Sequence, residues 1–308
     1  MLRNHRGELY LFMGSFVFSL NGIVSTVVLE HMSAFRLAQI RAIGAFLILF
    51  TYALIKRREL LRVTRPQIKT LIAYGIIGFA SVNFGYFLGI ERGLPLGLVL
   101  LLEFTAPIWV VLWIKYVRKG FVAAQMWLAI ALALIGLVLV AKVWEGFTFD
   151  LIGAAGALFS AFALTAYFLI GKNVTAERPP LSATILGLGV ASLFWMVVLP
   201  IWQFPSEIFS LKMDIHGFLA GQMIPGWALI LYIVVMGTIV PYICVISGLA
   251  LLNESKSSVI GMLEPVVAGG FAWLWFGQSW DAIQLFGGAI VLTGIYLADR
   301  AKATEHSQ

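Results

Sequence analysis

The sequence is poor in charged residues and contains one cysteine. Asp, Glu, Lys and Arg make up 12% of the 308 residues, and apolar residues make up 61%. Soluble globular chains carry about a quarter charged residues. A soluble core cannot absorb that apolar excess without large exposed patches, so the composition predicts a protein that is solvated by lipid. Cys244 lies in an apolar stretch, which excludes an intrachain disulfide and a cysteine-based metal site.

Several motifs of soluble enzymes are absent. The sequence has no His-Glu-x-x-His pair, no glycine-rich phosphate loop ending in Lys-Ser/Thr, and no Gly-x-Ser-x-Gly element. We therefore expect no metal, no other cofactor and no enzymatic activity, and nucleotide-driven pumping would need another chain. The net charge of +6 does not indicate nucleic acid, because the basic residues lie at the ends of apolar stretches. The histidines all fall outside those stretches: His5, His31, His216 and His306.

Apolar runs between charged or Pro/Gly breaks predict an all-α integral membrane protein. A membrane helix needs roughly 20 apolar residues, and ten such runs use nearly the whole chain. The first run is too long for a signal peptide and is expected to be retained. The predicted spans are Glu8–Leu29, Ser33–Ile55, Ile68–Ile90, Leu94–Tyr116, Phe121–Val143, Asp150–Gly171, Leu181–Gln203, Gly226–Leu252, Ser257–Phe276 and Ala282–Ala298.

The distribution of basic residues predicts the orientation. With both termini in the cytoplasm, most of the 21 Lys and Arg residues fall on the cytoplasmic side, as the positive-inside rule requires. The longest connection, residues 204–225, has two prolines and mixed polarity, and we expect a short interfacial helix there. The absence of long polar loops favours a multi-pass protein of a bacterial inner membrane over a receptor.

An internal repeat divides the chain into two halves, residues 1–148 and 149–308. An offset of 158 residues aligns several residues without a gap across about 70 positions. Because five spans per half is an odd number, the second half must enter the membrane from the opposite side. Inverted five-helix repeats of this kind are typical of secondary transporters, which hold substrate near the midplane. The aligned pairs are Tyr74 with Tyr232, Pro107 with Pro265, and Gly136 with Gly294.

Two carboxyl groups lie deep within predicted spans. Glu103 is about nine residues into the fourth span, and Glu264 has a similar depth in the ninth. A charge at the bilayer centre costs about 2.5–3.5 kcal/mol on insertion scales. Each residue is therefore expected to face a wet cavity, to pair with a donor, or to stay protonated. Both are candidates for substrate binding and proton coupling; the alternative is that they pair with a neighbouring donor.

Each carboxyl group has a proline nearby. Pro107 has no N–H, so the carbonyl of Glu103 loses its helical partner, and Pro265 does the same to Gly261, the residue aligned with Glu103. Broken backbone at this depth is tolerated only against protein or water. The matched placement favours a cavity at the two breaks, although each proline alone could be a packing kink.

Other polar residues within the spans are candidates for hydrogen bonds to substrate, although bonds between helices are the commoner role. Arg41 lies within the second span, where a structural pairing with a carboxylate or helix C-terminus is favoured over substrate contact. Gly136 and Gly294 allow close helix packing, within one monomer or in a homodimer. The polar binding candidates are Asn21, Asn83, Tyr86, Thr105, Tyr167 and Tyr242.

Several of these segments together resemble the drug/metabolite transporter superfamily, and within it the EamA family of ten-helix exporters. The run Leu94 to Pro107 is similar to the fourth-helix motif of the threonine/homoserine exporter subgroup. Pro241-Tyr242, Met262-Leu-Glu-Pro265 and Phe276-Gly-Gln-Ser resemble the second-half signature. Gln278 stands where the family usually has Glu, so one acidic residue is missing.

The resemblance implies a 5+5 inverted fold and a cavity bounded by the first, third, fourth, sixth, eighth and ninth helices. It also implies export of amino acids or related metabolites, with membrane lipid and a small-molecule substrate as partners. The leading hypothesis is therefore a secondary exporter of small amino acids that works by alternating access. The alternatives are an exporter of aromatic amino acids or drug-like compounds, an intramembrane enzyme acting on lipid, and a non-transporting structural protein.

Overall fold

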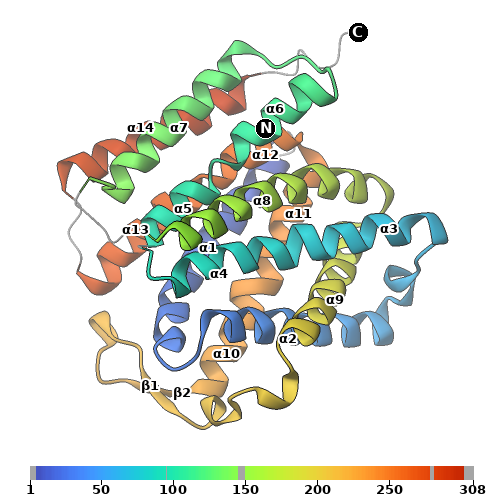
Figure 1. Ribbon diagram of the computed structural model, residues 1–308, viewed down its shortest axis with the longest axis vertical. Coiled ribbons are helices and arrows are strands. Elements are labelled where there is room, and N and C mark those ends of the chain that lie inside the picture. The colour runs from blue at the N-terminus through green and yellow to red at the C-terminus, as the bar shows by residue number, and fades with distance from the viewer. Residues whose placement is uncertain (1–4, 95, 145–149, 278–280, 302–308) are drawn as a thin grey trace.

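The computed structural model describes residues 5–94, 96–144, 150–277 and 281–301, and these are almost entirely helical (Figure 1). The boundary predicted between residues 148 and 149 lies outside these ranges. In the first half the helices are α1 (Arg6–Leu29), α2 (Ala34–Lys56), α3 (Arg65–Ala73), α4 (Val82–Glu91), α5 (Leu96–Glu103), α6 (Ala106–Leu112) and α7 (Ala124–Ala141). In the second half they are α8 (Leu151–Glu177), α9 (Pro180–Val198), α10 (Gly226–Val234), α11 (Val240–Leu251), α12 (Glu254–Gly261), α13 (Leu263–Phe276) and α14 (Ala282–Arg300).

Nine helices within the described residues are long and apolar enough to cross a membrane. They correspond to nine of the ten predicted spans. The remaining predicted span, Ser257–Phe276, is formed by α12 and α13, which are separated at Met262. The chain is therefore an all-α membrane protein with ten membrane segments, of which the fourth (α5 and α6) and the ninth (α12 and α13) are each divided into two helices.

The two repeats share their irregularities as well as their helices. The third segment contains π-helical turns over Tyr74–Ser81 and the eighth over Val235–Ile239, so the two irregular stretches end 158 residues apart. The helix end at Glu103 likewise lies 158 residues before the helix end at Gly261. Both breaks occur a few residues before a proline that cannot donate a backbone hydrogen bond. This common offset confirms the predicted repeat at the level of the backbone.

The last helices of the two repeats, α7 and α14, lie side by side as an outer pair (Figure 1). Glycines permit their close approach: a Cβ on Gly136 would lie 2.5 Å from the carbonyl oxygen of Gly287. A Cβ on Gly294 would lie 2.7 Å from the carbonyl oxygen of Ala129. The small-residue faces predicted in these helices thus join the two repeats within one chain.

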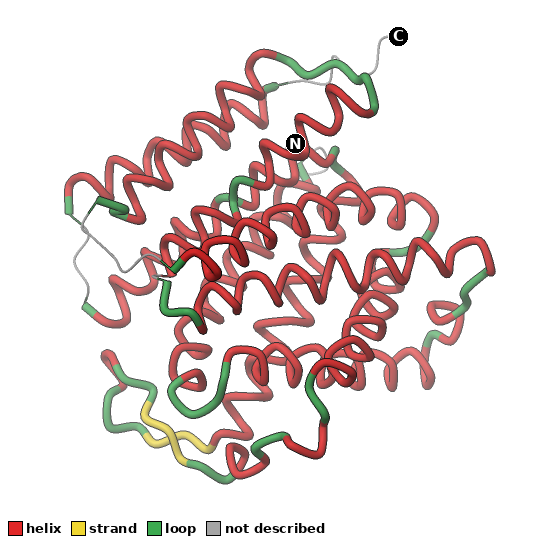
Figure 2. The backbone as a smooth tube through the Cα atoms, in the orientation of Figure 1, coloured by secondary structure: helices red, strands yellow, loops and turns green. Residues whose placement is uncertain are grey.

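The connection after α9 contains a β-ribbon that was not predicted. Strands β1 (Lys212–Asp214) and β2 (Met223–Pro225) pair antiparallel, and two 3₁₀ turns, Ser206–Phe209 and Gly217–Leu219, are found in place of the expected helix (Figure 2). Asp214 accepts hydrogen bonds from the backbone N–H groups of His216 and Gly221, at 2.9 Å and 3.0 Å. These bonds hold the pKa of Asp214 below its usual range.

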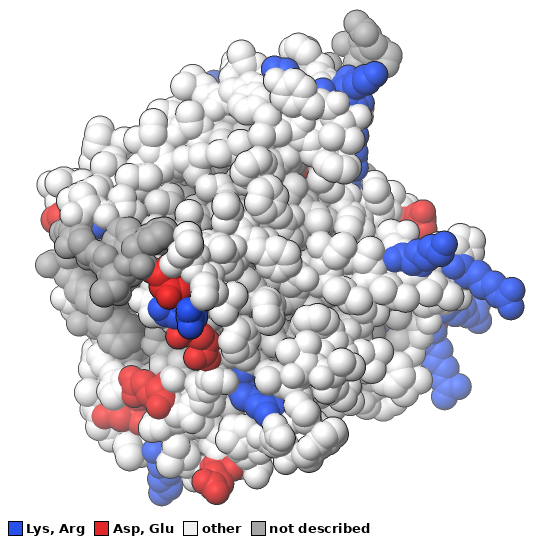
Figure 3. Space-filling model, in the orientation of Figure 1, with Lys and Arg blue, Asp and Glu red and all other residues white. Residues whose placement is uncertain are grey.

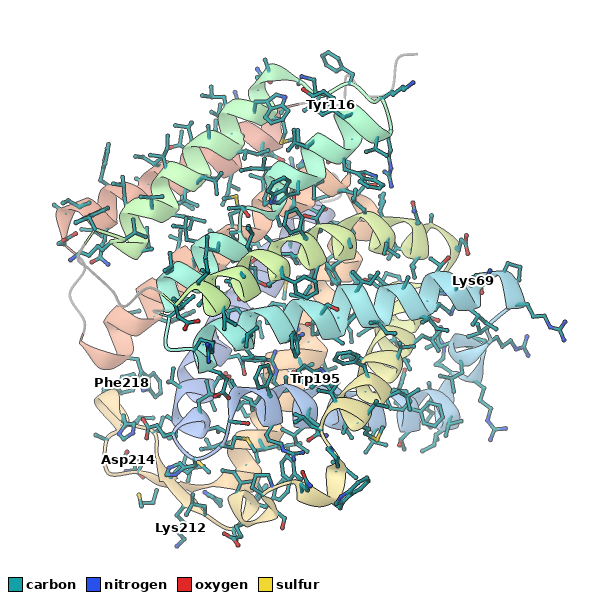
Figure 4. All side chains as sticks on the ribbon, in the orientation of Figure 1. Lys69, Tyr116, Trp195, Lys212, Asp214 and Phe218 are labelled. Atoms are coloured by element: carbon teal, nitrogen blue, oxygen red, sulfur yellow. The ribbon has the colours of Figure 1, made fainter. Side chains whose placement is uncertain are left out.

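Charged side chains gather at the ends of the membrane segments. Figure 3 shows Lys and Arg side chains along the right edge of the molecule, and acidic residues with fewer basic ones at the lower left. Figure 4 places Lys69, in α3, and Lys212, on β1, at these two ends. The wide band between them is almost free of charge on this face. This distribution agrees with the pattern from which the orientation is predicted.

Candidate functional site

A cavity of about 310 Å³ lies between the two repeats. It is bounded by α1, α4, α5, α8, α11, α12 and α13, which belong to the six segments expected from the family resemblance. Arg41 of α2 adds a seventh segment to the wall. The polar residues that line it are Ser15, Ser19, Asn21, Ser25, Thr26, Arg41, Asn83, Tyr86, Glu103, Tyr167, Tyr242, Ser257 and Glu264.

Helix α1 presents a polar stripe to the cavity. Ser15 and Ser19 are four residues apart, and Ser25 continues the same broad face one to two turns later. The Ser19 hydroxyl lies 2.7 Å from the carbonyl oxygen of Ser15 and 2.9 Å from that of Glu264. Ser19 therefore ties α1 to the first turn of α13, where the Glu264 side chain enters the cavity.

Four polar atoms of the lining are buried without a hydrogen-bond partner in the described part of the chain. They are Asn21 Oδ1, Ser25 Oγ, Tyr167 OH and Ser257 Oγ. A buried polar group without a partner costs about 1–3 kcal/mol. All four atoms belong to residues that line the cavity, but each atom itself is covered by protein in this structure.

The two predicted carboxyl groups both reach this cavity but differ in their surroundings. Glu103, at the end of α5, is 7% exposed, and its Oε1 accepts a hydrogen bond of 2.8 Å from the hydroxyl of Ser160 on α8. The carboxyl group of Glu264 has no hydrogen bond or ion pair to any described residue. Glu264 is thus the less constrained of the two.

Arg41 is the basic residue of the lining, and its hydrogen bonds go to uncharged acceptors. Its Nε donates to Thr238 Oγ1 at 3.1 Å, and its Nη2 donates to the carbonyl oxygen of Gly237 at 2.8 Å. Both acceptors lie in the π-helical turns of the eighth segment. No carboxylate of the described residues is within ion-pair distance of the guanidinium. Of the two structural partners considered for Arg41, a carboxylate or a helix C-terminus, the structure shows no carboxylate; a backbone carbonyl oxygen and a hydroxyl of the π-helical turns accept its hydrogen bonds.

Aromatic residues close another side of the cavity. Asn83 Nδ2 donates to the carbonyl oxygen of Phe79 at 2.7 Å and lies 3.3 Å from the hydroxyl of Tyr242. The Tyr242 ring meets the Phe18 ring edge-on, with 5.3 Å between centroids. These contacts fix Tyr242 between the repeats and leave its ring on the cavity wall. Tyr86 and Tyr167 add two further rings to the lining.

Thr105 is the predicted binding residue that does not line the cavity. Its hydroxyl donates to the carbonyl oxygen of Leu102 at 2.7 Å and accepts from the Trp109 indole at 3.3 Å. It thereby satisfies backbone at the break between α5 and α6. Pro107 and Pro265 are buried next to the two breaks and likewise lie outside the lining. Ser15, Ser19 and Ser257 were not predicted, although the four-residue spacing of the first two could have indicated them.

Ion pairs fasten the start of α12 at one end of the cavity. Lys256 Nζ lies 2.5 Å from Glu8 Oε1 and 2.6 Å from Asp299 Oδ1, which connects α12 with α1 and α14. Arg118 Nη1 lies 2.7 Å from Glu254 Oε1. Among the described residues, no group of three His, Cys, Asp or Glu side chains is placed to hold a metal ion.

A family model for the EamA-like transporter family matches the chain twice, over residues 5–142 and 151–298. These two matches coincide with the two repeats described above. Together they cover nearly all of the chain.

Individual relatives are more distant. An uncharacterized transporter of Archaeoglobus fulgidus is 25% identical over 77% of this chain and 78% of its own length. The uncharacterized inner membrane transporter YicL of Salmonella typhimurium is 24% identical over 95% and 94%. The threonine/homoserine exporter RhtA of Escherichia coli is 27% identical over 75% and 71%. A solved crystal structure superimposes with a TM-score of 0.73 at 14% identity, covering 96% of this chain and 99% of its own, which establishes similarity of fold alone.

Proposed function

This chain belongs to the EamA-like transporter family, and from that premise we propose that it exports small amino acids or related metabolites by alternating access. Membership of the family makes the protein a transporter of small molecules and not an enzyme. The proposal adds the class of substrate and the mechanism.

The observation that carries the proposal is the cavity between the repeats. Its volume of about 310 Å³ is at the lower end of the range of about 300–1,000 Å³ for small-molecule sites. Its wall combines acidic, basic, amide and hydroxyl groups, which suit a small polar molecule that carries charges of both signs. The RhtA relative, named as a threonine/homoserine exporter, supports the same substrate class.

Alternating access would use the symmetry of the fold. The two repeats place a broken helix on each side of one cavity, and rocking of the halves 1–148 and 149–308 would expose that cavity to each side of the membrane in turn. The sequence lacks a nucleotide-binding loop, so an ion gradient or exchange is the source of energy that we propose. Proton antiport through Glu103 or Glu264 is the specific form of coupling that their depth supports.

We further propose a bacterial inner membrane as the location, with both termini in the cytoplasm. The charge pattern supports this orientation, and one relative is named as an inner membrane transporter. The substrate-binding residues that we propose are Asn21, Asn83, Tyr86, Glu103, Tyr167, Tyr242 and Glu264, all of which line the cavity.

Counterflow in proteoliposomes tests the proposal. Vesicles containing the purified protein are loaded with one unlabelled amino acid at a time, and uptake of the same labelled amino acid at trace concentration is followed. Because counterflow needs no ion gradient, it separates translocation from coupling. Accumulation with threonine, homoserine or another small amino acid supports the proposal. If no amino acid of the panel accumulates, although the purified protein is monodisperse, the proposal is contradicted.

A second candidate function is export of aromatic amino acids or drug-like compounds. The observation in its favour is the aromatic part of the wall, which includes Phe18, Phe104, Phe168 and the three tyrosines. Tryptophan and phenylalanine in the same counterflow panel distinguish the two functions. Faster exchange of these than of threonine would favour the second.

A further inference from the structure

Arg41 and Glu264 have side chains of opposite charge, and both line the same cavity. Neither side chain has an ion-pair partner among the described residues, and both line the cavity. They form no salt bridge with each other, and Glu103 is a second carboxyl group on the wall of the same cavity. A buried charge is costly unless it is paired, so this separation of two opposite charges requires an explanation.

The guanidinium of Arg41 is held in place by one edge only. Two of its five N–H donors are bonded, to Thr238 Oγ1 and to the Gly237 carbonyl oxygen. The Thr238 hydroxyl donates its own hydrogen to the carbonyl oxygen of Ile233 at 3.1 Å, so its oxygen is oriented to accept from Arg41. Three N–H donors therefore stay without a partner in the described part of the chain, which is what a carboxylate needs for two parallel hydrogen bonds.

Glu264 is positioned in a comparable way. Its backbone carbonyl is held by the Ser19 hydroxyl at 2.9 Å, whereas its carboxyl group is left without a bond to any described residue. Glu103 differs, because Ser160 already occupies one of its carboxyl oxygens. Glu264 is thus the carboxylate of the cavity that is free to accept hydrogen bonds from an ammonium group.

We propose that Arg41 and Glu264 form the two ends of a zwitterion site, in which Arg41 binds the carboxylate of an α-amino acid and Glu264 binds its ammonium group. This inference rests on the proposed function and makes it narrower. It requires both charged groups on the substrate, and it disfavours cationic drugs, because Arg41 repels a cation that lacks a carboxylate.

The test uses counterflow of labelled L-threonine with three competitors: L-threonine, L-threonine amide and N-acetyl-L-threonine. The amide lacks the carboxylate and the acetyl derivative lacks the ammonium group. A site that hydrogen-bonds both groups is expected to favour threonine over each analogue at least about tenfold in the wild-type protein. This comparison uses only the wild-type protein, so its result cannot be caused by a variant that fails to fold.

Two variants then assign the ends of the site. Arg41→Lys keeps the charge but loses the planar fork, and is expected to narrow the preference for threonine over its amide while leaving the preference over N-acetyl-threonine unchanged. Glu264→Gln is expected to show the reverse pattern. Matched controls are Arg36→Gln on α2, where Arg36 bonds Gln39 and the carbonyl of Pro200, and Glu177→Gln at the end of α8. Both controls should retain both preferences.

The possible failures are distinct. Counterflow of threonine with equal competition by all three compounds overturns the zwitterion site and leaves the proposed function intact. Unchanged preferences in Arg41→Lys and Glu264→Gln do the same. Absence of counterflow for every amino acid, in the wild type and both controls, overturns the proposed function and this inference together.

Discussion

The fourth and ninth membrane segments are broken at matching positions, yet they carry their carboxyl groups on opposite sides of the break. Glu103 is the last residue of α5, whereas Glu264 is in the first turn of α13. A carboxylate is favoured at a helix N-terminus and disfavoured at a C-terminus. Glu264 therefore has support from its own helix, and Glu103 depends on Ser160. Both repeats thus keep the helix break, but the carboxyl group precedes the break in the first repeat and follows it in the second.

The largest expected effect is that of Glu264→Gln. Because this carboxyl group has no hydrogen bond or ion pair to any described residue, we expect it to bind the substrate directly, and we expect threonine counterflow to fall at least about tenfold. The measurement is the initial counterflow rate at equal protein content. A rate equal to that of the wild type would contradict the claim that Glu264, unlike Glu103, binds the substrate directly.

A smaller and different effect is expected for Glu103→Gln. Glutamine can still accept the hydrogen bond from Ser160, so the cavity should keep its shape and counterflow should stay within about threefold of wild type. If Glu103 carries the coupled proton, transport driven by a pH gradient is lost in this variant. Transport by this variant is measured with and without a pH gradient, which separates loss of proton coupling from loss of substrate exchange. Full gradient-driven transport in both Glu103→Gln and Glu264→Gln would exclude proton coupling through these residues.

Gly261→Ala tests the flexibility of the second break. Gly261 occupies the position of Glu103, and a Cβ there would meet its nearest neighbours, Phe104 and Phe168, at an ordinary 3.8–3.9 Å. We expect a gain of about 0.4–1 kcal/mol in stability, because alanine restricts the unfolded chain, together with slower counterflow. Thermal unfolding followed by tryptophan fluorescence measures the first effect. A loss of stability would show that Gly261 needs a conformation that alanine cannot adopt.

The smallest effect is expected for Thr105→Val. The Thr105 hydroxyl serves the backbone at the first break and lies outside the cavity lining. Substrate preference should therefore match the wild type, while stability falls by about 0.5–1.5 kcal/mol through the lost hydrogen bond. Competition assays beside a thermal unfolding curve separate the two effects. A changed substrate preference would place Thr105 in the binding site after all.

Much of this fold was predictable because apolar runs, prolines and the internal repeat are local properties of the sequence. The breaks near Pro107 and Pro265 follow from the missing N–H of proline. The sixth segment was predicted to end at Gly171, but α8 continues to Glu177. Lys172 explains part of the difference, because its ammonium group bonds carbonyl oxygens at the end of the eighth segment, which is distant in sequence.

The partners of Arg41 show why the remainder could not be predicted. Its acceptors, Gly237 and Thr238, lie in a π-helical turn nearly 200 residues away in the sequence. No local sequence pattern predicts such a turn. The β-ribbon of residues 212–225 escaped prediction because strands of three residues leave no period to detect. Tertiary contacts, and not local preference, decide both features.

The single cysteine offers a spectroscopic reporter that needs no engineered background. Cys244 is buried in α11, two residues after Tyr242 and directly before Val245, which both line the cavity. Because its thiol is buried, we expect it to react faster with a maleimide dye when α11 separates from its neighbours. The rate at which Cys244 is labelled, compared with and without a trial substrate, therefore measures how often the cavity opens in a protein with no engineered cysteine.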